Sequence, residues 1–136
     1  MKVGIVGSRE FVAASKVRKL IFELKKIYGD KLEIVSGGQA KGADGFAKKY
    51  ALELGVKYVA FPPAHYTWNT HCIKEAFNYG KDYRVWYYNQ RNTEIAEYSD
   101  VVVCFLPIGW DIKQSKGTND TYKKAKKLGK VTKIIN

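Results

Sequence analysis

Apolar residues follow two different patterns along this chain, and the two patterns alternate. Continuous apolar runs predict buried strands, whereas apolar residues three and four positions apart predict one face of a helix. The continuous runs predict strands at residues 2–6, 32–35, 56–61, 100–106 and 131–135. The helical spacing predicts helices at residues 12–28, 43–54, 94–98 and 118–128. Strand and helix therefore alternate along most of the chain.

The apolar character of the predicted strands indicates the fold class. Strands that are apolar throughout are typical of a parallel sheet with both faces buried, and parallel neighbours are joined by right-handed helical crossovers. We therefore predict an α/β fold, a Rossmann-like three-layer sandwich with a mostly parallel sheet, formed by one domain over residues 1–136. Ligands of such folds bind beyond the carboxyl ends of the strands. Ser8, residues 36–41 and residues 106–118 occupy those positions here.

An aromatic-rich insertion at about residues 62–90 interrupts the alternation. A short helix near residues 72–79 and an extra strand or hairpin arm at residues 83–88 are predicted within it. Its aromatic side chains could stack on a base, but packing against the domain or a second subunit is the more common use of such rings. We expect this segment to mediate self-association into a homodimer or a higher homo-oligomer. The rings are Tyr66, Trp68, Phe77, Tyr79, Tyr83, Trp86, Tyr87 and Tyr88.

Charge is the part of the composition that changes this picture. Because 24 Lys and Arg residues stand against 13 Asp and Glu residues, the formal net charge is +11, which favours anionic partners such as nucleotides or nucleic acid. Solvated lysines on helix surfaces are an equally good explanation for most of this charge. The two cysteines indicate no disulfide framework, and no apolar run is long enough to span a membrane. We expect a cytoplasmic protein with no membrane partner.

The segment Gly7-Ser8-Arg9 follows the first predicted strand. A glycine at this position lets the backbone turn beneath a ligand, and Arg9 can bind a phosphate with two parallel hydrogen bonds. The alternative is an ordinary turn with an arginine in solvent. The segment predicts a phosphate contact only in combination with others.

A glycine-rich segment, residues 36–44, follows the second predicted strand and leads into a helix. Its glycines flank Lys41, and Asp44 stands in the first helical turn, where its carboxylate could accept hydrogen bonds from ribose hydroxyls. The alternative is an aspartate favoured there by the helix dipole. The segment contains neither a Gly-x-Gly-x-x-Gly dinucleotide fingerprint nor the Gly-Lys-Ser/Thr ending of a P-loop.

Ser115-Lys116-Gly117-Thr118 precedes another predicted helix, where free backbone N–H groups favour an anion. Simple capping of that helix by Thr118 or Asn119 is the alternative.

His65, His71 and Cys72 match no firm spacing of metal ligands, so we predict no metal site and no cofactor.

Together with Arg91-Asn92, these segments resemble the SLOG superfamily, and most closely its YspA-like, cpYpsA-related branch. The pattern of that branch runs Gly-Ser-Arg-x-Phe, Ser-Gly-x-Ala-x-Gly-Ala-Asp, Arg-Asn and Ser-x-Gly-Thr, and this chain has the four motifs in the same order. The resemblance covers nearly the whole chain except the aromatic insertion. It implies a Rossmann-like domain that binds a nucleotide or a nucleotide-derived ligand.

A more distant resemblance links residues 91–118 to the LOG-type phosphoribohydrolases, which cleave the glycosidic bond of base-modified nucleoside monophosphates. Their arginine matches Arg91, and their Gly-Thr-x-x-Glu matches Gly117 and Thr118 but has glutamate where this chain has Thr121. A threonine hydroxyl cannot replace the carboxylate that glycosidic cleavage needs. If catalysis occurs, the candidate residues are Arg91 as well as Asp120 and Glu94, the nearby acids.

The DNA-processing protein A family, which binds single-stranded DNA, resembles the chain in the Gly-Ser-Arg, glycine-rich and Arg-Asn segments.

From these resemblances together we predict a sensor, a sequestering protein or a weak N-glycosidase for a nucleotide ligand. Single-stranded DNA binding and LOG-like phosphoribohydrolase activity are the alternatives. The resemblance places phosphate near the glycine-rich loops and ribose near Asp44. The ligand-binding candidates are Gly7, Ser8, Arg9, Ser36, Gly37, Gly38, Lys41, Asp44, Arg91, Asn92, Ser115, Gly117 and Thr118.

Overall fold

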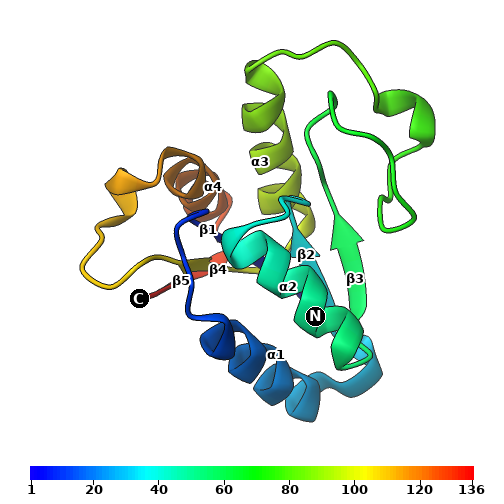
Figure 1. The fold of residues 1–136 in the computed structure, drawn as a ribbon. Helices are drawn as coiled ribbons and strands as arrows, with labels where there is room; N and C mark the ends of the chain where they lie inside the picture. Colours follow the sequence, from blue (N-terminus) through cyan, green and yellow to red (C-terminus); the bar gives the residue numbers. More distant parts are fainter.

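Five strands form one central sheet in the computed structural model, which describes residues 1–136 (Figure 1). The strands lie in the order β3-β2-β1-β4-β5, and every neighbouring pair is parallel. This arrangement confirms the predicted α/β fold class, with a sheet that is parallel throughout. The strands are β1 (Lys2–Gly7), β2 (Glu33–Ser36), β3 (Lys57–Ala60), β4 (Val101–Phe105) and β5 (Val131–Ile135).

Four α-helices cover the sheet, two on each face, and complete the three layers. The helices are α1 (Ala14–Tyr28), α2 (Gly42–Glu53), α3 (Trp86–Tyr98) and α4 (Lys116–Lys127). Successive side chains of a strand point to opposite faces, so Ile5 of β1 packs with α1 and α2 whereas Val6 packs with α3 and α4. Three 3₁₀ helices complete the elements, η1 (Gly29–Lys31), η2 (Ala76–Asn78) and η3 (Ile112–Gln114).

The helix α3 begins eight residues before the predicted start at residue 94, and the extra strand or hairpin arm predicted at residues 83–88 is wrong. Three consecutive aromatic residues open this helix, and they have no helical periodicity that would reveal it. The helix predicted near residues 72–79 is reduced to the single turn η2. Packing between segments distant in sequence determines the start of α3 and the length of η2, and the local pattern of apolar residues does not.

The insertion folds back against the edge of the sheet and against the start of α3. The Ala60 N–H of β3 donates to the His71 carbonyl at 3.0 Å, and Lys81 N–H donates to the Ala64 carbonyl at 3.1 Å. The His65 ring packs among four tyrosine rings, with centroid distances from 4.8 to 6.1 Å, and two of these tyrosines belong to α3. The insertion therefore packs against both β3 and the first turn of α3.

The chain connectivity leaves a natural site for a ligand between β1 and β4. The connections from β1 and from β4 run in opposite directions along the sheet, because β2 lies on one side of this pair and β5 on the other. Such a switch point opens a crevice at the carboxyl ends of the two strands. No helix of the structure has the length and apolar character that crossing a membrane requires.

Candidate functional site

A cavity of about 570 Å³ lies at this switch point, bounded by the end of β1, the start of α2, and helices α3 and α4. The structure brings together nine of the residues singled out in the sequence around this cavity: Gly7, Ser8, Arg9, Asp44, Arg91, Asn92, Ser115, Gly117 and Thr118. Six others lie outside its lining: Ser36, Gly37, Gly38, Lys41, Glu94 and Asp120.

The loop after β1 supplies a hydroxyl and a guanidinium to the cavity. Ser8 is buried, and its Oγ accepts a hydrogen bond from the Glu10 N–H at 3.0 Å. Arg9 is exposed and forms no ion pair or hydrogen bond within the chain. The helix α1 begins at Ala14, two residues after the predicted start at residue 12, so no helix N-terminus directly follows Ser8.

The glycines of the loop before α2 allow close packing between segments of the protein. A Cβ on Gly37 would collide with the Arg91 guanidinium, which donates a hydrogen bond from Nη1 to the Gly37 carbonyl at 2.8 Å. Gly42 has a positive φ of 68°, and a Cβ there would collide with the Ser8 carbonyl. The lack of a side chain at these two glycines therefore leaves room for the Arg91 guanidinium and for the loop after β1.

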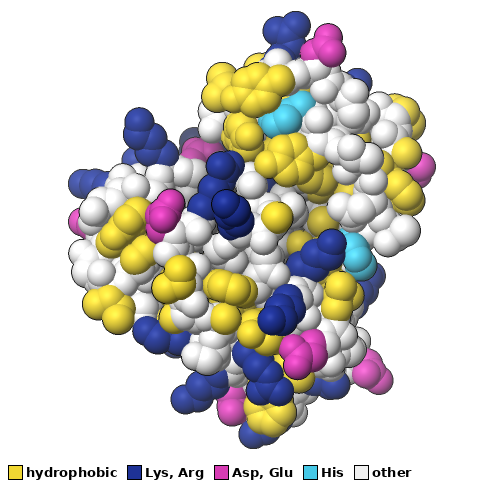
Figure 2. Space-filling model, in the orientation of Figure 1, with side chains coloured by type: hydrophobic (Ala, Val, Ile, Leu, Met, Phe, Trp, Pro, Cys, Tyr) yellow, Lys and Arg dark blue, Asp and Glu magenta, His cyan; other side chains and the backbone are white.

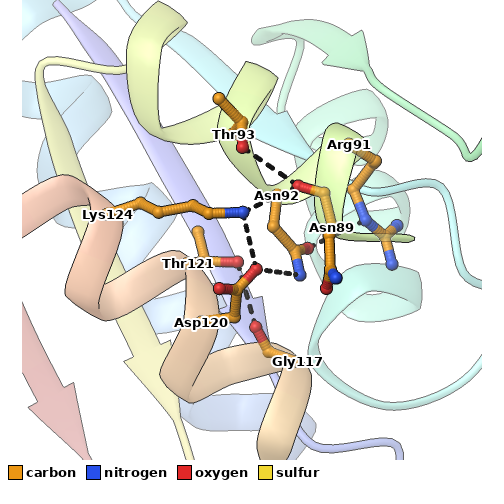
Figure 3. Close-up of polar contacts among 8 residues, drawn as sticks. All are labelled: Asn89, Arg91, Asn92, Thr93, Gly117, Asp120, Thr121 and Lys124. Atoms are coloured by element: carbon orange, nitrogen blue, oxygen red, sulfur yellow. Dashed lines mark hydrogen bonds and ion pairs between the residues drawn. The ribbon is translucent and has the colours of Figure 1, made fainter. Parts of the chain in front are cut away.

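A chain of hydrogen bonds fixes Arg91 between three segments (Figure 3). Its Nε donates to Asn92 Oδ1 at 3.1 Å, and Asn92 Nδ2 donates to Asp120 Oδ2 at 3.2 Å. Lys124 Nζ lies 2.9 Å from the same Asp120 oxygen and donates to the Asn89 carbonyl, also at 2.9 Å. The Asp120 carboxylate thus orients the Asn92 amide so that the amide oxygen accepts the hydrogen bond from Arg91 Nε.

The two acids considered for catalysis are both held by lysines. Asp120 is paired with Lys124, and Glu94 is paired with Lys74 at 2.8 Å. At the position where the phosphoribohydrolases have glutamate, Thr121 lines the cavity, and its hydroxyl donates to the Gly117 carbonyl at 3.1 Å. The carboxyl groups that do line the cavity are those of Asp44 and Glu10.

Asp44 is buried at the start of α2, where it forms no ion pair shorter than 4.0 Å. Burial raises the pKa of this carboxyl above 3.8, and the positive charge of Arg91 opposes the rise. The Gln39 backbone N–H lies 3.5 Å from Asp44 Oδ2. A buried carboxyl with a perturbed pKa in a cleft is a candidate for a functional group.

The raised pKa of Asp44 makes a testable prediction about pH. The folded protein holds the Asp44 proton more tightly than the unfolded chain, so ionisation favours unfolding, and this contribution to stability falls as pH rises from 3.8 through the folded-state pKa. Asp44→Asn cannot ionise, so we expect the unfolding free energy of the wild type to fall relative to that of the variant as pH increases from about 4 to about 8. Urea unfolding across this range measures the difference, and a wild type that gains stability relative to Asp44→Asn as pH rises would contradict the raised pKa of Asp44.

The N-terminus of α4 opens on the cavity without a capping side chain. The Ser115 and Thr118 hydroxyls contact each other at 2.7 Å, and neither caps the helix. The first N–H groups of a helix have no intrahelical acceptor, and they carry the positive end of the helix dipole. Because α4 begins at Lys116, two residues before the predicted start, Gly117 and Thr118 lie within this first turn.

Several cavity residues with polar or aromatic side chains were not chosen from the sequence, among them Gln39, Tyr88 and Trp110. Gln39 stands inside the glycine-rich segment and Trp110 inside the loop after β4, so their positions were indicated but their roles were not. Tyr88 was hidden in the insertion, because the start of α3 was not predicted. Figure 2 shows basic side chains near the middle of this face and hydrophobic side chains over the insertion and the start of α3.

The fold is that of a Rossmann-like α/β protein, and its cavity lies at the carboxyl ends of the strands. A sequence profile of the family described as the YspA, cpYpsA-related SLOG family matches residues 1–71. The chain belongs to this family. No curated protein matches its sequence.

Solved structures with the same fold share little sequence with this chain. DNA processing protein A from Helicobacter pylori, described for its single-stranded DNA binding mode, has 23% identity and a TM-score of 0.71; all of this chain aligns with 65% of that chain, which is less than two thirds of it. The molybdenum cofactor binding protein from Rippkaea orientalis has 22% identity and a TM-score of 0.65, and 98% of this chain aligns with 74% of that one. The molybdenum cofactor carrier protein from Chlamydomonas reinhardtii has 20% identity, a TM-score of 0.61 and the same two coverages.

Proposed function

We propose that this protein binds a nucleotide or a nucleotide-derived ligand in the cavity and holds it through its phosphate. The uncapped N-terminus of α4, which opens on the same cavity as Ser8 and the unpaired Arg9, is the observation that carries the proposal. Backbone N–H groups at a helix start, a hydroxyl and an arginine together match the oxygen atoms of a phosphate. One structural neighbour is described by its binding of single-stranded DNA, whose backbone is built on phosphate, and another as a molybdenum cofactor binding protein.

Binding, as in a sensor or a sequestering protein, explains this site better than glycosidic cleavage. Asp120 and Glu94 lie outside the cavity lining and are neutralised by lysines. An N-glycosidase here would need Asp44 or Glu10 as its acid, and the Thr121 hydroxyl is already bonded to the Gly117 carbonyl. We therefore propose retention of the ligand without its cleavage.

Single-stranded nucleic acid is the second candidate ligand, because hydrophobic rings reach the surface beside the cavity. Val85 lines the cavity, and its neighbour Trp86 is 51% exposed. Exposed rings next to a phosphate site can stack on successive bases, and the net charge of +11 suits a polyanion. Binding to an oligonucleotide would weaken steeply with salt, since many counterions are released, whereas binding of one nucleotide would change little.

The decisive test of phosphate binding compares ribose 5-phosphate with ribose by titration calorimetry. We expect the phosphorylated sugar to bind and the free sugar not to bind. Arg9→Ala should weaken ribose 5-phosphate binding by about 1.5–3 kcal/mol, which is the strength of hydrogen bonds to charged groups. Arg18→Ala, which removes an exposed arginine on α1 outside the cavity, serves as the matched control.

Two results would refute this proposal. The first is equal behaviour of ribose and ribose 5-phosphate, and the second is equal loss of affinity in the Arg9 and Arg18 variants. Native mass spectrometry of the freshly purified protein gives an independent view, because a retained nucleotide would appear as a defined added mass.

A further inference from the structure

Gln39 and Tyr88 form a wall of the cavity that the phosphate does not need. We propose that this wall is the subsite for the base of the nucleotide, with the base stacked on Tyr88 and an acceptor atom of the base bonded to Gln39 Nε2. This assignment rests on the proposed function and names the feature that would distinguish a nucleotide from a simple sugar phosphate.

The Gln39 side chain has a donor with no partner. Its Oε1 accepts a hydrogen bond from the Tyr66 hydroxyl at 3.1 Å, so one side of the amide is fixed by the insertion. Its Nε2 is buried and has no acceptor within the chain. Buried polar groups in proteins are nearly always hydrogen-bonded, so a buried donor on a residue that lines a cavity indicates a missing acceptor. Ring nitrogens and carbonyl oxygens of bases are such acceptors.

The Tyr88 ring is held in place by its neighbours. The His65 ring meets it nearly edge-on at 5.2 Å, Tyr83 lies 6.4 Å away, and the Arg91 guanidinium carbon lies 5.7 Å from its centroid. The same His65 ring meets the Tyr66 ring at 5.1 Å, so Tyr66 and Tyr88 pack against one common ring. Tyr66, Gln39 and Tyr88 are therefore one connected group, and a fixed ring loses little freedom when a base stacks on it.

The size of the cavity also suits a ligand larger than a phosphate. Its volume of about 570 Å³ falls within the range of sites for ligands of nucleotide size. The residues proposed to bind phosphate line only the part of the cavity that is formed by α4 and the loop after β1. The remaining wall is aromatic and polar, as a base requires.

The test compares ribose 5-phosphate with the four common nucleoside 5′-monophosphates by calorimetry. We expect at least one monophosphate to bind roughly 5- to 150-fold more tightly than ribose 5-phosphate, the range that base stacking on an aromatic ring provides. Tyr88→Leu and Gln39→Met should each reduce this ratio and leave ribose 5-phosphate binding unchanged. Tyr66→Phe should reduce it less, because it frees the Gln39 amide without removing it.

Tyr87→Leu is the matched control, because Tyr87 belongs to the same ring cluster and helix but does not line the cavity. An unchanged ratio in this variant supports the proposal, and a loss equal to that of Tyr88→Leu overturns it. Ribose 5-phosphate binding as tightly as all four monophosphates overturns the base subsite and leaves the phosphate function standing. Failure of all five compounds to bind overturns the proposed function itself. If Tyr88→Leu does not fold, the near-isosteric Gln39→Met decides alone.

Discussion

Arg91→Met is expected to impair both folding stability and ligand binding. The guanidinium is buried and donates to the Gly37 carbonyl and to Asn92 Oδ1, so methionine leaves two buried acceptors without a donor. The unfolding free energy should fall by about 1–3 kcal/mol, the cost of unsatisfied buried groups. The pKa of Asp44 should rise further, because Arg91 is the charge that opposes the effect of burial. Urea unfolding and calorimetry with ribose 5-phosphate measure the two losses, and we expect the affinity to fall at least about tenfold.

Two further variants separate the geometry of Arg91 from its charge. Arg91→Lys keeps the charge but not the planar fork, so it should recover little of the stability, because an ammonium group cannot match both acceptors. Arg84→Met removes an exposed arginine just before α3 and should have little effect on either measurement. Full stability in Arg91→Met, or full recovery in Arg91→Lys, would be inconsistent with the hydrogen bonds from Arg91 to Gly37 and Asn92.

Gly117→Val should lower the affinity for the ligand without lowering the stability of the fold. A Cβ on Gly117 would meet no protein atom within 4 Å, and Gly117 lines the cavity in the first turn of α4. The added side chain therefore occupies ligand space without straining the fold, and valine has a higher helix propensity than glycine. We expect an unchanged or slightly raised thermal midpoint and an affinity for ribose 5-phosphate lower by roughly 10- to 150-fold, as expected when a phosphate loses its charge-assisted contacts.

Asn119→Ala is the control for this prediction, because Asn119 lies in the same region of α4 but outside the cavity lining. Its affinity for ribose 5-phosphate should equal that of the wild type. Wild-type affinity in a folded Gly117→Val protein would remove the α4 N-terminus from the phosphate site.

The sheet was predictable from sequence because most residues of its strands are apolar. The run at residues 100–106 illustrates this, since β4 occupies Val101–Phe105. The start of α3 was not predictable, because Tyr87 and Tyr88 pack against His65, which stands at the other end of the insertion. Local patterns carry no information about such packing.

The candidate site was predictable to the level of its loops but not of its contacts. The motifs located Ser8, Asp44 and Gly117, which all line the cavity. Spacing could not show that Gly37 makes room for a buried arginine, because this relation depends on the packing of α3 against the loop before α2. The pair of Asp120 and Lys124, four residues apart on α4, is a relation that helical spacing can show. The helix start at Lys116 was missed by two residues, since Ser115 does not cap it.

The position of Arg91 also bears on when the site is assembled during folding. Its hydrogen bond to Gly37 joins residues 54 positions apart, and the bond from Asn92 reaches 28 positions ahead to Asp120. Contacts between residues distant in sequence carry a loop-closure cost that must be met before they stabilise the chain. A growing chain that has exposed only its first three strands contains Gly37 but lacks Arg91, Asn92 and Asp120. On the proposed function, ligand affinity should therefore appear during synthesis only after α4 has been made, which makes binding a reporter of the assembled site.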